Sequence, residues 1–236
     1  MKTLGVIGGL GPAATALFMQ MVIEMTDADT DQEHIRMLVD CCPQIPDRTG
    51  YILGKSKDSP APLMIEIGRR LANAGAQLIA IPCITSNYFY EVFKKEIPVP
   101  IINTIAEIKA LLNDAGIKNA GLMATSGTIA SGLFQAAFNT GGGRLILPSD
   151  EMQSDVMHLI YDNVKAGKSA EMDRFNKVSD ALRADGAEII ILGCTELSVI
   201  KRNEPLGGGY LDALEVIARK AVSECARLKP EYEDLL

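Results

Sequence analysis

Residues 75–83 read GAQLIAIPC, and residues 186–194 read GAEIIILGC. In each stretch a Gly-Ala pair leads into a short apolar run, and the run ends on a cysteine. Apolar runs without strict alternation are typical of β-strands covered on both faces, as in a parallel sheet. The repeated pattern therefore predicts two matching strands, with Cys83 at the carboxyl end of one and Cys194 at the carboxyl end of the other.

Similar short apolar runs alternate with helical patterns along the rest of the chain. Further strands are expected at 3–8, 35–40 and 120–125, where Val, Ile and Leu are abundant. The segments between them carry apolar residues at helical spacing. Strands that alternate with helices in this way indicate an α/β fold with mainly parallel sheets.

The two halves of the chain also begin alike, because GVIGGLGPAAT (5–15) aligns with GLMATSGTIAS (121–131). The general likeness of α/β units explains the shared hydrophobic pattern, but it does not explain a cysteine at the same place in both halves. We therefore expect two α/β domains related by duplication. Their expected bounds are 1–98 and 99–207, with residues 208–236 returning to the first domain.

The composition narrows the classes of function. The chain has 236 residues, of which 47% are hydrophobic and 22% charged, and this is enough for sizeable cores. The formal net charge is -7, and no stretch is rich in Lys or Arg, which argues against a nucleic-acid or anionic-membrane partner. No run reaches the roughly 18 uninterrupted apolar residues of a membrane span.

The five cysteines are an odd number without a CxxC motif, which argues against a disulfide framework and against a zinc site of familiar spacing. Free thiols are typical of a reducing compartment, so we expect a cytoplasmic protein. The start of the chain, from Lys2 to Val22, resembles a signal peptide. The glycines and proline of GGLGPAAT would break a secretory helix, however, and a strand, turn and helix explain this segment better.

The expected positions of Cys83 and Cys194 suit one reaction well. Ligands of open parallel sheets bind beyond the carboxyl ends of the strands, so two facing domains would bring both thiols to one crevice. Inversion of a carbon acid needs one group to remove a proton from one face and another to deliver a proton to the opposite face. The reference pKa of a thiol is about 8.5, so both of its ionisation states are accessible near neutral pH.

The alternative for each cysteine is buried packing, which is the more common role of a single cysteine at a strand end. The matched positions of Cys83 and Cys194, each closely followed by Thr, favour a chemical role instead. Cys41 and Cys42 are interpreted as packing or loop residues, and Cys225 as a core residue.

Five motifs of this chain resemble those of the cofactor-independent aspartate/glutamate racemases, most closely the aspartate racemase branch. They are GVIGGLGPAAT, PDRT (46–49), IPCITSN (81–87), ATSGT (124–128) and LGCTEL (192–197). The resemblance implies two flavodoxin-like, three-layer domains with the active site in the cleft between them. It also implies a homodimer, and racemisation of an amino acid without pyridoxal phosphate or metal.

The resemblance further implies roles for individual residues. Cys83 and Cys194 would be the paired acid and base. Arg48 would bind a substrate carboxylate with its planar fork, and Lys165 would supply a second positive charge, although solvated charge is the more common role of such residues. The α-carboxylate and amine would be held by hydroxyl and backbone groups of Thr85, Ser86, Thr125, Ser126, Thr128 and Thr195.

The chain departs from the family pattern directly after its first cysteine. The family usually reads PCNTAH at this place, whereas this chain has Ile84 in place of Asn and Asn87 in place of His. The loss of Asn removes a donor and an acceptor expected beside the substrate's amino-acid head. A non-catalytic amino-acid-binding protein on the same scaffold is therefore an alternative function.

A second alternative comes from the glycine-rich turn. Gly9, Gly11 and Ala14 satisfy G-x-G-x-x-A after an expected strand, and Asp40 ends the next one as a ribose-binding acid would. This pattern would indicate an NAD-dependent oxidoreductase. The fingerprint is short, Asp40 comes later than the usual spacing, and the matched cysteines would have no role.

Overall fold

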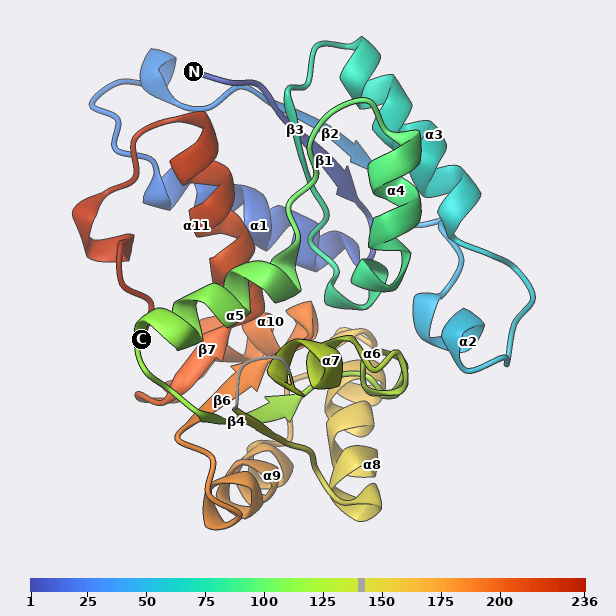
Figure 1. The fold of residues 1–236 in the computed structure, drawn as a ribbon, viewed down its shortest axis with the longest axis vertical. Helices are drawn as coiled ribbons and strands as arrows, with labels where there is room; N and C mark the ends of the chain where they lie inside the picture. The colour runs from blue at the N-terminus through green and yellow to red at the C-terminus, as the bar shows by residue number, and fades with distance from the viewer. Residues whose placement is uncertain (140–142) are drawn as a thin grey trace.

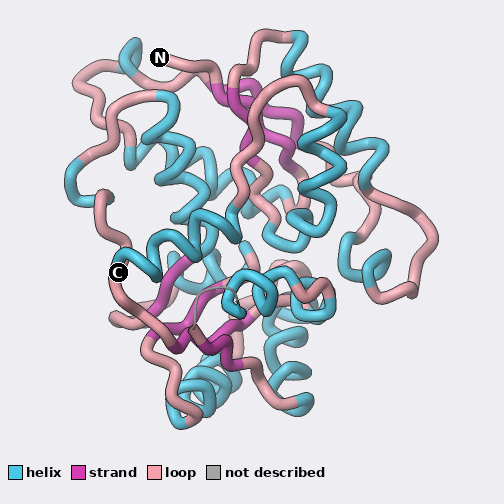
Figure 2. The backbone as a smooth tube through the Cα atoms, in the orientation of Figure 1, coloured by secondary structure: helices cyan, strands magenta, loops and turns pink. Residues whose placement is uncertain are grey.

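The structure, a computed structural model, describes residues 1–139 and 143–236. Its strands form two separate parallel sheets, each surrounded by helices (Figures 1 and 2). The first sheet has the order β2-β1-β3, from β1 (Leu4–Gly8), β2 (Met37–Cys41) and β3 (Leu78–Ala80). The second has the order β5-β4-β6-β7, from β4 (Asn119–Met123), β5 (Arg144–Ile146), β6 (Ile189–Leu192) and β7 (Tyr210–Asp212). The predicted α/β fold with parallel sheets is confirmed.

The helices connect these strands. The α-helices are α1 (Pro12–Met25), α2 (Arg48–Ile52), α3 (Ala61–Asn73), α4 (Tyr90–Glu96), α5 (Thr104–Asp114), α6 (Ser126–Ala130), α7 (Leu133–Asn139), α8 (Asp150–His158), α9 (Met172–Ala184), α10 (Thr195–Asn203) and α11 (Ala213–Cys225). Short 3-10 helices are η1 (Asp31–Glu33), η2 (Ile84–Phe89) and η4 (Pro230–Tyr232), and η3 (Leu159–Val164) is a π-helical turn. None of the helices in the described part of the chain is long and apolar enough to cross a membrane.

Two strands of the first sheet, β1 and β3, are fully buried, which explains why they read as continuous apolar runs, whereas β2 at the edge is half-buried. Leu4 and Val6 of β1 pack on one face in a core that contains Phe18 of α1. Ile7 of β1 packs on the other face in a second core, with Ile67 of α3. Successive side chains of β1 point to opposite faces of the sheet, so α1 covers one face and α3 covers the other. Full burial of one such side chain contributes about 1.5–3 kcal/mol.

The second sheet is covered in the same way. Ala120 and Leu122 of β4 belong to the core that also contains Phe134 of α7. Met123 of β4 and Ile190 of β6 belong to a third core with Phe175 of α9. Each sheet is therefore the middle layer of a three-layer unit.

The two sheets share a strand order that fits a duplication. The central strand of each sheet lies between the second and third strands of its half, as β2-β1-β3 and β5-β4-β6. An isolated parallel bridge from Ile79 to Ile101 extends the first sheet beside β3, at the place that β7 occupies beside β6. β5 and β7, which the sequence analysis did not predict, have three residues each.

The C-terminal segment lies against the first half of the chain. α11 packs against α1 and α5, as Figure 1 shows. Backbone hydrogen bonds join Lys2 N to Cys225 O and Lys229 N to Met25 O, each at 3.0 Å. β7 belongs to the second sheet, although it follows residue 207. The domain bounds remain a prediction.

Candidate active site

Each of the two matched cysteines begins a helix at the carboxyl end of a strand. Cys83 follows β3 and is the N-cap of η2, and Cys194 follows β6 and is the N-cap of α10. Both have extended backbone, with φ of -159° and -145°, and their exposed fractions are only 6% and 7%. Two strands of different sheets therefore deliver one buried thiol each.

Both thiols line one small cavity, named here the cysteine cavity. Its volume is about 10 Å³. Five other residues singled out in the sequence also line it, and these are Arg48, Thr85, Thr125, Lys165 and Thr195. Leu10, Asp47, Thr49, Ile84, Tyr161 and Glu196 complete the lining.

Three other residues singled out in the sequence lie outside this lining. Ser86 donates a 2.5 Å hydrogen bond to the Cys83 carbonyl and lines a different cavity. Thr128 is buried and shares a 2.9 Å hydrogen bond with Thr85. Ser126 accepts a 3.2 Å hydrogen bond from Gln153 and lines a larger neighbouring cavity.

Cys194 is held in a chain of charged contacts. Its thiol donates a 2.8 Å hydrogen bond to Glu196 Oε2, and Glu196 Oε1 lies 2.5 Å from Lys165 Nζ. Burial, and then the negative charge of Glu196, raise the pKa of Cys194 well above its usual range. Burial would lower the pKa of Lys165, but the charges of Glu196 and Cys194 raise it overall. The arrangement favours a neutral thiol beside an intact ion pair.

Arg48 is a buried cation beside the other thiol. Its Nη2 donates to Leu10 O at 2.9 Å, and its Nη1 donates to Pro46 O at 3.0 Å. Burial would lower the pKa of Arg48, but the charge of Cys83 and a hydrogen bond to it raise that pKa overall. Arg48 therefore joins the glycine-rich turn to the segment before α2 and places positive charge near Cys83.

A cluster of hydroxyl groups completes the polar wall of the site. Thr85 Oγ1 lies 3.1 Å from Thr125 Oγ1, and Thr125 Oγ1 lies 3.1 Å from Thr128 Oγ1. Thr125 is also the N-cap of α6, since its side chain accepts a hydrogen bond from Thr128 N. These hydroxyls can each donate or accept, which suits a carboxylate or an ammonium group.

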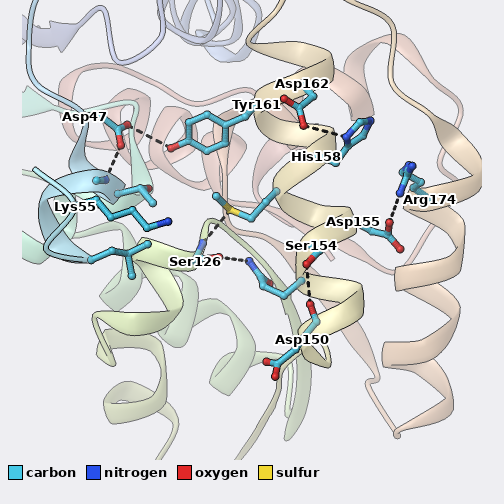
Figure 3. Close-up of a pocket in the computed structure, with 15 residues that line it drawn as sticks. Asp47, Lys55, Ser126, Asp150, Ser154, Asp155, His158, Tyr161, Asp162 and Arg174 are labelled. Carbon is cyan, nitrogen blue, oxygen red and sulfur yellow. Dashed lines mark hydrogen bonds and ion pairs between the residues drawn. The ribbon is translucent and has the colours of Figure 1, made fainter.

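A much larger polar cavity, named here the outer cavity, adjoins the cysteine cavity. Its volume is about 800 Å³, and Asp47, Thr49 and Tyr161 line both cavities. Figure 3 shows Tyr161 and Asp47 pointing toward each other at one end of the outer cavity. The Tyr161 hydroxyl donates a 3.3 Å hydrogen bond to Asp47 Oδ2.

The glycine-rich turn is filled by the protein's own atoms. Gly9 has a positive φ of 89°, and a Cβ there would lie 2.4 Å from the Cys42 carbonyl carbon. A Cβ on Gly11 would meet Glu196 Oε1 at 3.7 Å. Asp40, the expected ribose-binding acid, is paired with Arg70 at 2.6 Å. The turn therefore contacts the backbone of Cys42 and the side chain of Glu196. Asp40 is engaged in an ion pair with Arg70.

Several lining residues were not singled out in the sequence. Glu196 had a local signal, because an acid two residues after a proposed reactive cysteine on the same helix end can reach its sulfur. Asp47 lies within the quoted PDRT motif, but its contact with Tyr161 had no local signal, since the two residues lie 114 positions apart and meet only in the folded chain. In the described part of the chain, no cluster of three or more His, Cys, Asp or Glu side chains could hold a metal ion.

The chain is a two-sheet α/β protein, and comparison with known proteins shows the family to which it belongs. The model of the Asp/Glu/hydantoin racemase family matches residues 7–221. The chain belongs to this family, and the expected resemblance is confirmed.

Individual relatives cover almost the whole chain. The aspartate racemase of Picrophilus torridus has a structure that matches with a TM-score of 0.88, 28% identity and coverage of 98% of both chains. The broad specificity amino-acid racemase RacX of Bacillus subtilis is 25% identical over 232 residues, which are 93% of this chain and 96% of RacX. A glutamate racemase of Francisella tularensis shares the fold, with a TM-score of 0.68, 16% identity and coverage of 94% of this chain and 80% of its own. The chain therefore belongs to a family of racemases, which are isomerases that act on small amino-acid substrates.

Proposed function

We propose that this protein interconverts the L and D forms of aspartate or glutamate, and that Cys83 and Cys194 are its two bases. The observation that carries the proposal is that both thiols line one cavity while following strands of different sheets. A planar intermediate between them would present one face to each sulfur. This is the geometry that inversion requires.

The charged groups beside the two thiols differ. Arg48 is a cation beside Cys83. The Cys194 thiol instead donates a hydrogen bond to the carboxylate of Glu196, which is paired with Lys165. In one direction Cys83, as thiolate, removes the Cα proton, and the Cys194 thiol delivers its own proton to the opposite face. The step leaves Cys83 protonated and Cys194 as thiolate, so no proton is gained or lost.

The substrate's charged groups need partners in the same cavity. The hydroxyls of Thr85, Thr125 and Thr195 line it and would hold the α-carboxylate and amine. Arg48 would bind a carboxylate, and its buried Nε, which has no hydrogen-bond partner among the described residues, supports this. Lys165 would add a second positive charge near the substrate. Both proton transfers are assigned to side chains of the chain itself, without pyridoxal phosphate or metal.

Ser86, Ser126 and Thr128, which the resemblance also proposed as binding residues, lie behind the lining or beside it. Thr128 and Ser86 would act by holding Thr85 and the Cys83 carbonyl in place. Ser126 faces the outer cavity. Assembly into a homodimer and a cytoplasmic location are further proposals from the resemblance, and light scattering and cell fractionation measure them.

A second candidate function is amino-acid binding without catalysis, and Ile84 is the observation that favours it. This apolar side chain lines the cysteine cavity at the place where the family usually has Asn. Incubation with L-aspartate or L-glutamate in deuterium oxide separates the two functions. Racemisation gives the D enantiomer with deuterium at Cα, whereas a binding protein returns unlabelled L substrate at saturating protein.

A further inference from the structure

Lys165 reaches the cysteine cavity from a loop of its own. This loop, residues 165–170 and named here the lysine loop, connects the π-helical turn η3 to α9. Lys165 Nζ lies 2.5 Å from Glu196 Oε1, and the other oxygen of Glu196 accepts the hydrogen bond of the Cys194 thiol. The position of the lysine loop therefore sets how closely Lys165 approaches the Cys194–Glu196 pair.

The lysine loop is only partly packed on the rest of the protein. A cavity of about 330 Å³ is lined by Gly167, Ser169 and Ala170 of the loop and by Val199 and Ile200 of α10. Because this space separates part of the loop from α10, contacts at the two ends of the loop must fix its position.

Asn163 makes such contacts from the end of η3. It is 4% exposed, and its carbonyl accepts a 2.9 Å hydrogen bond from Lys168 N. Its side-chain Oδ1 accepts a 3.2 Å hydrogen bond from Glu171 N, and its Nδ2 donates a 3.3 Å hydrogen bond to Glu171 Oε1. One buried side chain therefore joins the two ends of the lysine loop, with both its donor and its acceptor in use.

Glu171 is itself held from several sides. It is the N-cap of α9, but its side chain makes no capping hydrogen bond, and Glu is not among the preferred N-cap residues. Its carboxylate instead lies 2.7 Å from His158 Nε2 and accepts a 2.7 Å hydrogen bond from Arg174 Nε. His158, at the end of α8, and Arg174 of α9 are both labelled in Figure 3. Hydrogen bonds from Arg174, His158 and Asn163 lower the pKa of Glu171 to about 2, so it accepts them as a carboxylate near neutral pH.

We propose that Asn163 and Glu171 form a clasp that closes the lysine loop, and that Asn163 is a positioning residue that keeps Lys165 against Glu196 for the reaction. Asn163 does not line the cysteine cavity, so its effect on the reaction passes through Lys165. The inference rests on the proposed function for the reaction that Lys165 serves. The clasp itself is a property of the folded chain and can be measured without substrate.

The position of Lys165 matters to the reaction through Cys194. Burial and the charge of Glu196 raise the pKa of Cys194, and Lys165 lowers it. In the proposed step Cys194 gives up its proton and becomes a thiolate, which the ammonium group of Lys165 stabilises. A displaced loop would leave that thiolate beside a buried carboxylate without its cation.

Competitive acetylation measures the release of Lys165 without turnover. The intact protein is treated with a trace of acetic anhydride, and the acetylated peptides are quantified by mass spectrometry. Only the uncharged amine attacks the anhydride, and a neighbouring carboxylate favours the charged form, so release from Glu196 speeds the acetylation of Lys165. Exposed Lys57, in the segment between α2 and α3, is the internal reference for reagent concentration.

Two variants of Asn163 open the clasp in different ways. Asn163→Ala removes both side-chain hydrogen bonds. Asn163→Asp keeps the shape and the acceptor but faces the Glu171 carboxylate with a second negative charge. In both variants the acetylation of Lys165 relative to Lys57 should become at least about fivefold faster, as expected for one lost hydrogen bond. The rate of racemisation should fall by at least the same factor.

The matched control is Asn103→Ala. It removes the hydrogen bond that Asn103 accepts from Ala106 N as the N-cap of a different helix, α5. Its acetylation of Lys165 should stay at the wild-type rate. An equal rise in this control would assign the effect to a general loss of stability and would overturn the clasp, as would unchanged acetylation of Lys165 in both variants of Asn163.

The racemisation assay separates the clasp from the proposed function. Faster acetylation of Lys165 with unchanged racemisation would overturn the positioning role of Asn163. The expected acetylation rates in a protein that does not racemise amino acids keep the clasp and remove the proposed function. Wild-type racemisation with unchanged acetylation in the variants keeps the proposed function and removes the clasp.

Discussion

The Cys194 thiol donates a 2.8 Å hydrogen bond to Glu196, whose other carboxylate oxygen lies 2.5 Å from Lys165 Nζ. Glu196 is 5% exposed, so its charge acts through little water. The carboxylate holds the thiol proton on Cys194 and in turn depends on Lys165 for its own stability.

Replacement of Glu196 by Gln should lower the pKa of Cys194. Burial and the charge of Glu196 both raise that pKa, and removal of the charge leaves burial and exposes the thiolate to the full attraction of Lys165. The limb of the pH–rate profile that belongs to Cys194 should therefore move to lower pH. Glu196→Asp, which keeps the charge, is the control. An unshifted limb in Glu196→Gln would show that the carboxylate does not control the thiol.

Replacement of Lys165 by Met should destabilise the protein by about 1–3 kcal/mol. The change leaves the Glu196 carboxylate buried without its cation, and the Lys165 side chain is 25% exposed, which moderates the cost. The double variant Lys165→Met, Glu196→Gln should recover most of the loss, because no unpaired charge remains. Urea unfolding of the four proteins measures this cycle, and additive losses would contradict the coupling.

Replacement of Arg48 by Lys should cost about 1–3 kcal/mol, although the charge is kept. A single ammonium group cannot reproduce the donors that reach Leu10 O and Pro46 O from one planar fork. Because these bonds join the glycine-rich turn to the segment before α2, amide hydrogen exchange should become faster in both segments. Wild-type exchange and stability would show that the charge alone is sufficient.

Asp212 should make the stability fall as the pH rises from about 4 to 7. This buried N-cap of α11 accepts hydrogen bonds from Ser198 and Leu214 on Oδ1, whereas Oδ2 is buried with no partner in the described part of the chain. Burial, and then the charge of Glu215, raise the pKa of Asp212 from 3.8 to about 7. The folded state therefore binds a proton that the unfolded state has lost between these values.

The stabilisation from this proton is complete below the unfolded pKa and is lost as the pH passes the folded one. The contribution of Asp212 to the free energy of unfolding should fall by about 1.4 kcal/mol per pH unit at most within this window. Asp212→Asn removes the titrating group, so the free energy of unfolding of the variant should decline less steeply between about pH 5 and pH 7 than that of the wild type. Chemical unfolding at about pH 5, 6 and 7 measures both slopes. Parallel curves for the two proteins would contradict the raised pKa.

Much of the fold could be predicted from the sequence because burial on both faces leaves a clear apolar run. The runs that contain β1 and β6 are of this kind, and Cys83 and Cys194 follow the strands as expected. β3 is as short as β5 and β7, but its residues LIA lie within a longer apolar run. β5 and β7 were missed because RLI and YLD each include a charged residue, which leaves no apolar run.

The site could be predicted only where its residues carry local signals. Cys83 and Cys194 repeat at matched positions, and Arg48 lies in a family motif. The Tyr161–Asp47 contact depends on how η3 meets α2, and no local pattern encodes that meeting. Glu196 was within the quoted LGCTEL motif, but its role depends on the side chain of Lys165, which approaches from another element.

The most direct test of the two-base proposal is the exchange of the Cα proton in single-cysteine variants. Wild-type protein incubated with L-aspartate or L-glutamate in deuterium oxide should yield the D enantiomer carrying deuterium at Cα, by chiral chromatography and mass spectrometry. Cys83→Ala and Cys194→Ala should each abolish racemisation while they keep the fold by circular dichroism. Wild-type racemisation rates in both variants, or a D product without deuterium, would contradict the assignment of Cys83 and Cys194 as the two bases.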